Sequence, residues 1–570
     1  MAREVRTGSG RRVSTLRIAV VLVAAVAGAT TGDLVSSPRL LAATVRVPAE
    51  QPTIQAGIDA AAHGDTVLVA AGTYRERVQL SAGITVRSEG DDTKGELGLR
   101  RAETTIIDGT INDGDAIDGD AAKASLPGVT MAEAATLDGF TITGVGHYDD
   151  VRWQQNHASQ GEEQEKEAIG APGVAGVSID RITHCTVRHN IVHHIGYTGI
   201  GIEGAEGIRV APHIVGNVVY RNMGGGIGSM RGSSAVIEEN VCFENFYAGI
   251  GHEGGADPLV INNTCYANLR AGIGISEGAS PVVRGNTCYR NRRAGIGIRT
   301  GSDTCPVVEG NTCYENDMAG IGVRDEAAPI LRRNTCLRNA AAGIGMESGA
   351  RAVVSDNECR ENKLSGIGVQ DGASAVLLGN RCLENATVAI GVRHGAEVYA
   401  AHNTLSRSGG MPPLVAVRDG STAVLVDNRL TGGGVAGVLL EGTATISGNQ
   451  FDGNGPRKGG PPNFAIWVQE GSSLICNDNR SDRWRHAVFA TGAKSVRVND
   501  TRVSQFLGTA IVVRDCEQAA EVVGTVAFSD NPQDQAVEVV GPQAVVDNNT
   551  RVAQVTAPAT AEPAEAAATP

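Results

Sequence analysis

The chain has 570 residues, of which 49 are lysine or arginine and 63 are aspartate or glutamate, so its formal net charge is −14. Aromatic residues make up only 4% of it. An acidic chain with few aromatic residues lacks the basic surface and stacking side chains of nucleic-acid-binding proteins, so we expect no nucleic-acid partner.

Residues 1–43 have the pattern of an export signal. A basic stretch from Arg3 to Arg17 precedes an apolar run from Ile18 to Gly28. That run is about half of the ~20 residues that a bilayer span needs, which favours a signal peptide over the alternative, a retained anchor. We therefore expect an exported monomer that is periplasmic, cell-surface or secreted and leaves the membrane once the signal is removed.

Residues 44–550 are predicted to form one domain, and it opens with a short helix. Ile54, Ile58 and Ala61 fall on one helical face. A helix there would cover the open end of a stack of strands, where apolar side chains and strand edges are otherwise exposed.

Four aspartates follow closely between residues 105 and 120. Asp113, Asp115, Asp118 and Asp120 are hard oxygen donors of the kind that bind calcium, although their spacing is not that of an EF-hand. Asp-Gly turns between short strands explain the same residues without a metal. Calcium therefore stays one of two interpretations here.

The strand pattern is interrupted at residues 146–172. An insertion of this length is long for a compact domain, and such loops often carry function. It contains His147, Asp149 and Trp153. We expect it to fold over the strands that follow and to form the main concave site.

Histidines are concentrated around this insertion. Seven of the twelve lie between positions 147 and 213, and they include His189 and His193. Histidine can act as a base or a metal ligand near neutral pH. We predict Asp149, His189 and His193 as catalytic residues and His147 and Trp153 as substrate-binding residues; ordinary surface histidines are the alternative.

The centre of the chain is a repeat. Equivalent asparagines recur from Asn217 to Asn403 at intervals of 23 residues, with a single interval of 25. A fixed period of this size indicates a solenoid, and the period-2 alternation within each copy indicates strands. Each copy thus predicts one coil of a parallel β-helix, in which equivalent residues stack about 4.8 Å apart.

Three stacked rows follow from this register. The asparagines should lie at a bend, where their amides bond from coil to coil and left-handed backbone is tolerated. The Ile of each Gly-Ile-Gly, such as Ile273, and the Cys two residues after each Asn, from Cys242 to Cys382, should point inward. Those cysteines are expected to be reduced, to be metal-free and to pack as small apolar side chains.

His252 and Ser229 replace inward aliphatic residues in neighbouring coils, and we expect them to bond to each other.

An aromatic row and nearby arginines suggest a ligand. Tyr220, Phe243, Tyr266, Tyr289 and Tyr314 occupy one repeat position, and Arg292 and Arg293 belong to a basic patch with Arg270, Arg290 and Arg299. Tyr266, Tyr289, Arg292 and Arg293 are predicted substrate-binding residues for an anionic glycan, because rings can contact sugar faces and arginine binds carboxylates. A stack that only stiffens the coil is the alternative.

Residues 551–570 are low in complexity and predicted to be disordered.

Short motifs resemble those of one protein family. The chain opens with three such motifs, Ile-Gln-Ala-Gly-Ile-Asp-Ala-Ala (54–61), Gly-Asp-Thr-Val (64–67) and Gly-Thr-Tyr-Arg-Glu (72–76), and its coils repeat Asn-Thr-Cys-Tyr and Gly-Ile-Gly-Ile. Together they resemble pectin-lyase-like right-handed β-helix repeat proteins, including NosD-like ones. The resemblance implies an all-β, right-handed parallel β-helix over about residues 45–550. The sequence motifs of polygalacturonases, alginate epimerases and pectin esterases are absent, so it assigns no reaction.

Three functions remain open from the sequence. The first is binding or processing of an extracellular, anionic polysaccharide, with a polysaccharide lyase as the form that an enzyme would take. The second is a periplasmic metal-centre accessory protein similar to NosD. The third is a non-catalytic structural or adhesive rod.

Overall fold

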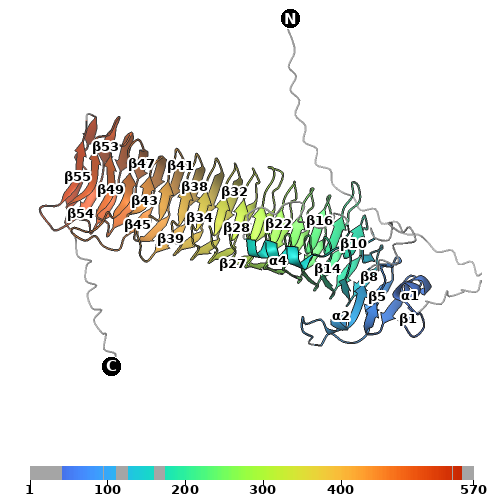
Figure 1. The fold of residues 1–570 in the computed structure, drawn as a ribbon. Helices are drawn as coiled ribbons and strands as arrows, with labels where there is room; N and C mark the ends of the chain where they lie inside the picture. The colour runs from blue at the N-terminus through green and yellow to red at the C-terminus, as the bar shows by residue number, and fades with distance from the viewer. Residues whose placement is uncertain (1–41, 94, 111–125, 160–173, 542, 555–570) are drawn as a thin grey trace, which may run out of the picture. The chain divides into compact units, whose positions relative to one another are not determined.

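The computed structural model describes residues 42–93, 95–110, 126–159, 174–541 and 543–554. These residues form stacked coils, and in each coil the chain passes through three short strands, one in each of the parallel sheets A, B and C (Figure 1). One regular coil consists of β17 (Val236–Glu238) in sheet A, β18 (Val241–Phe243) in sheet B and β19 (Ile250–His252) in sheet C. The fold is the all-β, right-handed parallel β-helix that the repeat predicts.

Equivalent residues pair in register from coil to coil. β18 pairs with β21 (Thr264–Tyr266), so Cys242 faces Cys265, and β19 pairs with β22 (Ile273–Ile275), so Ile250 faces Ile273. Cys265 and Ile273 have no exposed surface. The cysteines two residues after each Asn are all buried, which confirms the inward direction of both rows; they are Cys242, Cys265, Cys288, Cys313, Cys336, Cys359 and Cys382.

Sheet B carries most of the outward residues that matter below. Its further strands are β3 (Gly72–Tyr74), β6 (Thr105–Asp108), β9 (Thr141–Thr143), β12 (Ile191–His193), β15 (Val218–Tyr220), β24 (Thr287–Tyr289), β27 (Thr312–Tyr314), β30 (Thr335–Leu337), β33 (Glu358–Arg360), β36 (Arg381–Leu383), β39 (Thr404–Arg407), β42 (Arg429–Gly432), β45 (Gln450–Asp452), β48 (Arg480–Asp482), β51 (Arg502–Ser504), β54 (Val526–Phe528) and β57 (Arg551–Ala553). Sheet A runs from β1 (Thr44–Val47) to β56 (Ala544–Val546), and sheet C from β4 (Val78–Gln79) to β55 (Gln535–Val540).

The asparagines form a continuous chain of amides inside the bend between sheets A and B. Asn334 is representative: its Nδ2 donates to Asn357 Oδ1 at 3.0 Å, and its Oδ1 accepts from Asn311 Nδ2 at 3.0 Å. The expected left-handed backbone lies one residue earlier, as at Glu239 (φ 56°) before Asn240. A second chain, from Asn222 to Asn385, runs parallel to the first, five residues later in each coil.

The predicted capping helix is present as α1 (Ile54–Ala60). Thr53 caps its first turn by accepting from Ala56 N at 3.1 Å. Ile54 and Ile58 are fully buried, and α1 lies beside β1 at the first coil (Figure 1). The helix therefore covers that end of the apolar interior, as the sequence predicts.

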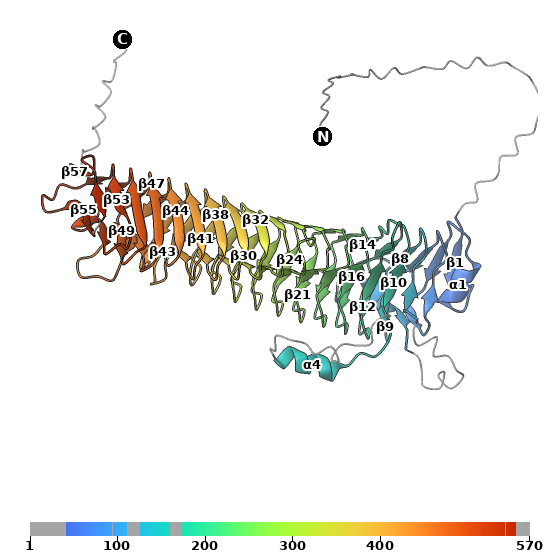
Figure 2. The same cartoon turned by 90° about the horizontal axis from the view of Figure 1, so that it is seen from above.

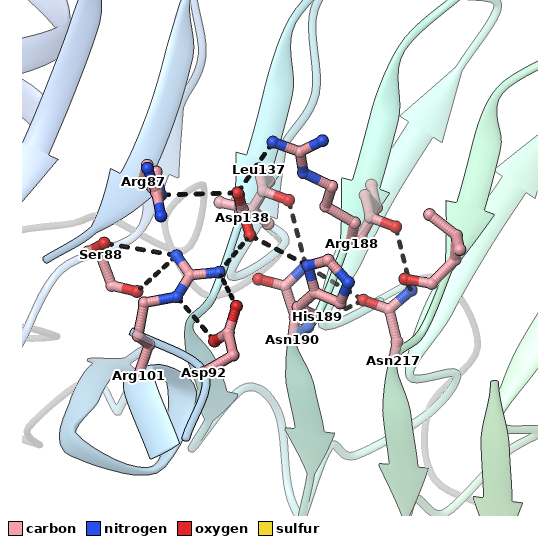
Figure 3. A network of polar contacts seen from close by, with 12 residues as sticks. Arg87, Ser88, Asp92, Arg101, Leu137, Asp138, Arg188, His189, Asn190 and Asn217 are labelled. Carbon is pink, nitrogen blue, oxygen red and sulfur yellow. Dashed lines mark hydrogen bonds and ion pairs between the residues drawn. The ribbon is translucent and has the colours of Figure 1, made fainter. Parts of the chain in front are cut away.

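A second helix, α2 (Arg100–Thr104), is attached by a buried ion cluster (Figure 3). Asp138, the last residue of β8 (Thr136–Asp138), accepts from Arg101 at 2.8 Å and lies 3.0 Å from Arg188 and 3.7 Å from Arg87. Asp92 binds the other side of Arg101. These pairs hold α2 so that Ala102 packs on the outside of sheet B against Ile191 and Val218.

The ends of the chain fall mostly outside the described ranges. Of the predicted export segment only Ala42 and Ala43 are described, and of the predicted tail only residues 551–554, where β57 still extends sheet B. Within the described ranges, no helix is long and apolar enough to cross a membrane.

Candidate functional site: the outer face of sheet B

The third residue of each sheet B strand points outward, and in five consecutive coils it is aromatic. We call Tyr220, Phe243, Tyr266, Tyr289 and Tyr314 the aromatic ladder. Its ring centroids are 4.7, 4.9, 5.0 and 4.9 Å apart, and neighbouring planes differ by 11° or less. His193 continues the stack at 4.9 Å from Tyr220.

This stacking decides which parts of the rings a ligand can reach. Parallel rings at this spacing cover one another's faces, so the edges face outward. The hydroxyl groups of Tyr220, Tyr266, Tyr289 and Tyr314 make no hydrogen bond to any side chain or backbone group in the described part of the chain. The ladder therefore offers a row of hydroxyl groups, whereas a sugar stacked on ring faces would find those faces occupied.

The insertion contains a third helix, α4 (Asp150–Ser159). Asp149 caps it by accepting from Arg152 N at 2.9 Å. Trp153 anchors it: the indole Nε1 donates to Glu244 O at 2.8 Å, and the ring packs in a buried cluster with Met223, Phe246 and Leu269. Figure 2 shows α4 outside the coils, beside the bends that leave sheet B. The helix is thus a wall along one side of the ladder.

A cavity of about 440 Å³ lies where the insertion leaves β9. Arg77, His147, Tyr148 and His194 line it, together with Thr110, Thr143 and two glycines. Tyr148 contacts His194 edge-to-face at 4.5 Å and donates to Asp150 at 3.2 Å. The cavity thus combines a cation, two imidazoles and a phenol, a set that can bind a carboxylate and accept or donate a proton.

His193 and His194 connect the cavity to the ladder. Their Nδ1 atoms lie 2.6 Å apart, so one of the two carries the hydrogen that they share. Burial, with His194 as a second cause, lowers the pKa of His193 to about 4, and burial also lowers the pKa of His194. Burial and the neighbouring Asp150 raise the pKa of Tyr148 well above its usual value. Near neutral pH both imidazoles are therefore free bases and the phenol keeps its proton.

The structure separates the three residues predicted to be catalytic. The ring of His193 stacks on that of Tyr220, and the Asp149 carboxylate caps α4. His189 precedes the start of β12, 3.4 Å from Asp138. His147, predicted as a binding residue, does line the cavity. Arg77 and Tyr148 were not predicted; they are distant in sequence, and only the packing of coils brings them together.

The predicted basic patch is divided among several surfaces. Arg292 contacts α4 through Asn156 O, Arg290 pairs with Glu315 at 3.0 Å, and Arg270 stacks over Tyr247 at 4.1 Å. Arg293 follows Arg270 one coil later, in the bend before sheet C. Burial, followed by the neighbouring cations Arg293 and Arg299, lowers the pKa of Arg270 to about 10, so these three arginines still lie near one another beside Tyr247. The predicted patch is therefore divided, because Arg290 and Arg292 contact other groups.

The expected bond between His252 and Ser229 is also absent. Ser229 instead bonds to Ser233, with the two Oγ atoms 2.7 Å apart. Both ring nitrogens of His252 are buried without a hydrogen-bond partner in the described chain, and burial lowers the pKa of this histidine to about 3. His252 thus lies in the core as a neutral, strained substitute for an aliphatic residue.

Sheet C offers few outward side chains. The middle residues of its strands are glycine in nine consecutive coils, from Gly201 to Gly391, and these glycines are in register. Any chemistry on that face would have to come from the flanking bends. Sheets A and B both carry charged and polar side chains on their outer faces, as Arg284, Glu309 and Arg332 do on sheet A.

Metal sites can be tested only in part. Among the described residues, no group of three or more His, Cys, Asp or Glu side chains is arranged to hold a metal ion. The predicted calcium ligands Asp113, Asp115, Asp118 and Asp120 lie in the stretch 111–125, outside those residues.

Comparison with known families identifies the coil region. Residues 175–307 and 301–411 match the profile of the family described as "Right handed beta helix region". The chain contains a right-handed β-helix region. No curated protein matches the sequence.

Solved structures with this fold are similar at low sequence identity. The mannuronan C-5 epimerase AlgE6 A-module of Azotobacter vinelandii is 18% identical, with 71% of this chain and 95% of that chain covered and a TM-score of 0.39. The catalytic unit of a GH87 α-1,3-glucanase from Streptomyces thermodiastaticus is 14% identical over 64% of this chain and 61% of that one, with a TM-score of 0.39. The pre-mature gene product 12 of bacteriophage phi29 is 12% identical over 84% and 68%, with a TM-score of 0.40. These similarities concern the β-helix fold alone.

Proposed function

We propose that this is an exported protein that binds an acidic polysaccharide, with one sugar unit in the cavity and the chain continuing along the aromatic ladder. The observation that carries the proposal is the continuity of the two surfaces. His194 lines the cavity and bonds to His193, which stacks on Tyr220, the first ring of the ladder.

The chemistry of each part suits such a ligand. Arg77 in the cavity can bind a carboxylate. The hydroxyl groups of Tyr266, Tyr289 and Tyr314 repeat at the strand spacing and can bond to the hydroxyl groups of a linear sugar chain. Phe243 leaves a gap between them and Tyr220. Trp153 holds α4 as a side wall, so the ladder is bounded along one side.

The free-base state of His194 favours β-elimination as a second, catalytic function. Arg77 would bind the uronate carboxylate and so acidify the neighbouring C–H. His194 would take that proton, and the electron pair of the C–H bond would form a carbon–carbon double bond as the adjacent bond to the leaving sugar breaks. Solvent water would return a proton to the oxygen of the leaving sugar. The lowered pKa of His194 keeps it unprotonated near neutral pH.

The test uses calorimetry to measure how tightly the full-length protein binds polygalacturonate, alginate and a neutral glucan. The variants His147→Ala and Tyr148→Phe should each weaken binding of the acidic polymers about tenfold or more, a loss of ~1.4 kcal/mol or more. His184→Ala is the matched control, because His184 is exposed and does not line the cavity.

Several results would contradict the proposal. They are equal binding of neutral and acidic polymers, unchanged affinity in both cavity variants, or the same loss in the His184→Ala control. For the catalytic function, absence of ultraviolet-absorbing unsaturated products from either acidic polymer would exclude β-elimination and leave binding standing.

A further inference from the structure

A second concave surface lies on the outer face of sheet B in the last coils and is lined by residues of β45 and β54, among other strands; both strands are labelled in Figure 1. It has a volume of about 510 Å³ and is lined by Arg429, Arg480 and Arg502 on one side and by Asp452 and Asp482 on the other. We call it the C-terminal groove. Its lining residues come from β42, β45, β48, β51 and β54, many coils away from the cavity.

The three arginines lie in one row. Arg429 pairs in register with Gln450, Gln450 with Arg480, and Arg480 with Arg502. All four side chains are exposed. Because neighbouring strands lie about 4.8 Å apart, the row presents guanidinium groups along a straight line.

The acidic side of the groove does not neutralise this row. Asp452 accepts from Arg483 Nε at 2.9 Å, and Asp482 accepts from Ser504 Oγ at 2.7 Å and lies 3.5 Å from Arg483. No ion pair or side-chain hydrogen bond within the described ranges involves Arg429, Arg480 or Arg502. The groove thus keeps three cationic side chains without a counter-charge, on a chain whose net charge is −14.

The same row in earlier coils is arranged differently. In the coils of the aromatic ladder it contains uncharged Thr264, Thr287 and Thr312. Further along, Arg381 lies opposite Glu358, and the two form an ion pair at 3.6 Å. Like charges directly opposite each other destabilise a sheet. Arg480 and Arg502 are like charges directly opposite each other, and a bound anion would remove their repulsion.

We propose that the C-terminal groove is a second binding site, for the carboxylates of a linear acidic polysaccharide. Arginine binds carboxylate through two parallel hydrogen bonds, so a row of arginines fits a polymer that carries one carboxylate on successive units. Phe528, half-buried at the end of the groove, adds an apolar surface beside the sugar chain. This inference rests on the proposed function, because it assigns the same class of ligand to a distant part of sheet B.

The test uses the full-length protein and polygalacturonate, with affinity measured at low and high salt. The groove variant is R429Q/R480Q/R502Q, and the matched control R351Q/R393Q/R497Q removes the same charge from exposed arginines elsewhere. We expect the groove variant to bind about tenfold more weakly or worse and with less dependence on salt, because three screened charge contacts are lost. The control should stay within about twofold of the unaltered protein, and both variants should melt at the same temperature.

The outcomes separate the two proposals. If affinity in the groove variant stays within twofold while His147→Ala still weakens binding, the groove proposal is wrong and the proposed function stands. If the groove variant loses binding while the cavity variants do not, the cavity assignment is wrong and the groove is the binding site. If the unaltered protein binds no acidic polysaccharide, or binds DNA or polyphosphate more tightly through the same arginines, the assigned ligand class is wrong.

Discussion

Replacing Asp138 by Asn should destabilise the first coils, because it removes the one carboxylate at the centre of the ion cluster. Asp138 and Arg101 have side-chain exposures of 3% and 2%, and they are 2.8 Å apart. Arg188 and His189 lie at 3.0 and 3.4 Å from the same carboxylate. Asparagine has the same shape, so the variant changes the charge and leaves the volume unaltered.

The size of the loss in stability depends on which partner Arg101 keeps once Asp138 is replaced by Asn. Breaking a buried ion pair by removing one partner costs about 3–5 kcal/mol, since the other charge is left buried without compensation. Arg101 keeps Asp92, at 2.6 and 2.8 Å. We therefore expect a loss of about 3 kcal/mol, at the low end of that range, with α2 loosened from sheet B.

Urea unfolding followed by circular dichroism measures this loss, and hydrogen exchange shows where it falls. Asp180→Asn is the matched control: Asp180 pairs with Arg181 on the surface, where such pairs contribute about 0–1 kcal/mol. Exchange should accelerate in α2, β8 and β11 (Thr186–Arg188). A loss below about 1 kcal/mol, or equal losses in both variants, would refute the assigned role of the cluster.

Three further predictions concern the core. His252→Leu should stabilise the protein by about 1–2 kcal/mol, because it removes two buried nitrogens that lack partners; a lower midpoint in urea would contradict this. The free energy of unfolding should fall as the pH falls from 6.5 towards 4. Burial holds the pKa of His193 at about 4 and that of His252 at about 3 in the folded protein, whereas the unfolded chain takes up these protons near pH 6.5. In a His193→Gln/His252→Leu double variant, the free energy of unfolding should depend less on pH between these values. Cys288→Val should cost less than about 1.5 kcal/mol, and a thiol reagent should modify only Cys305 in the folded protein, the single exposed cysteine of the eleven; early modification of the others would contradict the packing.

The coil itself could be predicted because its signals are local. One asparagine per 23 residues fixes the register, and the register alone places Ile273 and Cys265 inside. The second amide chain, from Asn222 to Asn385, was missed although it repeats with the same period. It lies in the polar bend after sheet B, where buried amides and exposed loop residues look alike in sequence.

The candidate site could be predicted only in part, since its members meet through stacking of distant coils. His147 was expected and lines the cavity, whereas Arg77 joins it from the second coil with no local motif. The helix in the insertion gave no signal either. It is short and largely polar; Trp153 is its one buried residue, and Arg292 adds a bond to Asn156 O.

The uniform direction of the amide chain has a consequence for the length of the protein. Every asparagine of this chain of amides from Asn190 to Asn449 donates towards the next coil, as Asn190 does to Asn217 and Asn403 to Asn428. A coil such as residues 264–286 can therefore be deleted or duplicated with its neighbours still meeting a matching donor and acceptor. Each such change moves the C-terminal groove about 4.8 Å nearer to the cavity or farther from it. The number of coils would then set the shortest polymer that can reach both sites, in steps of one strand.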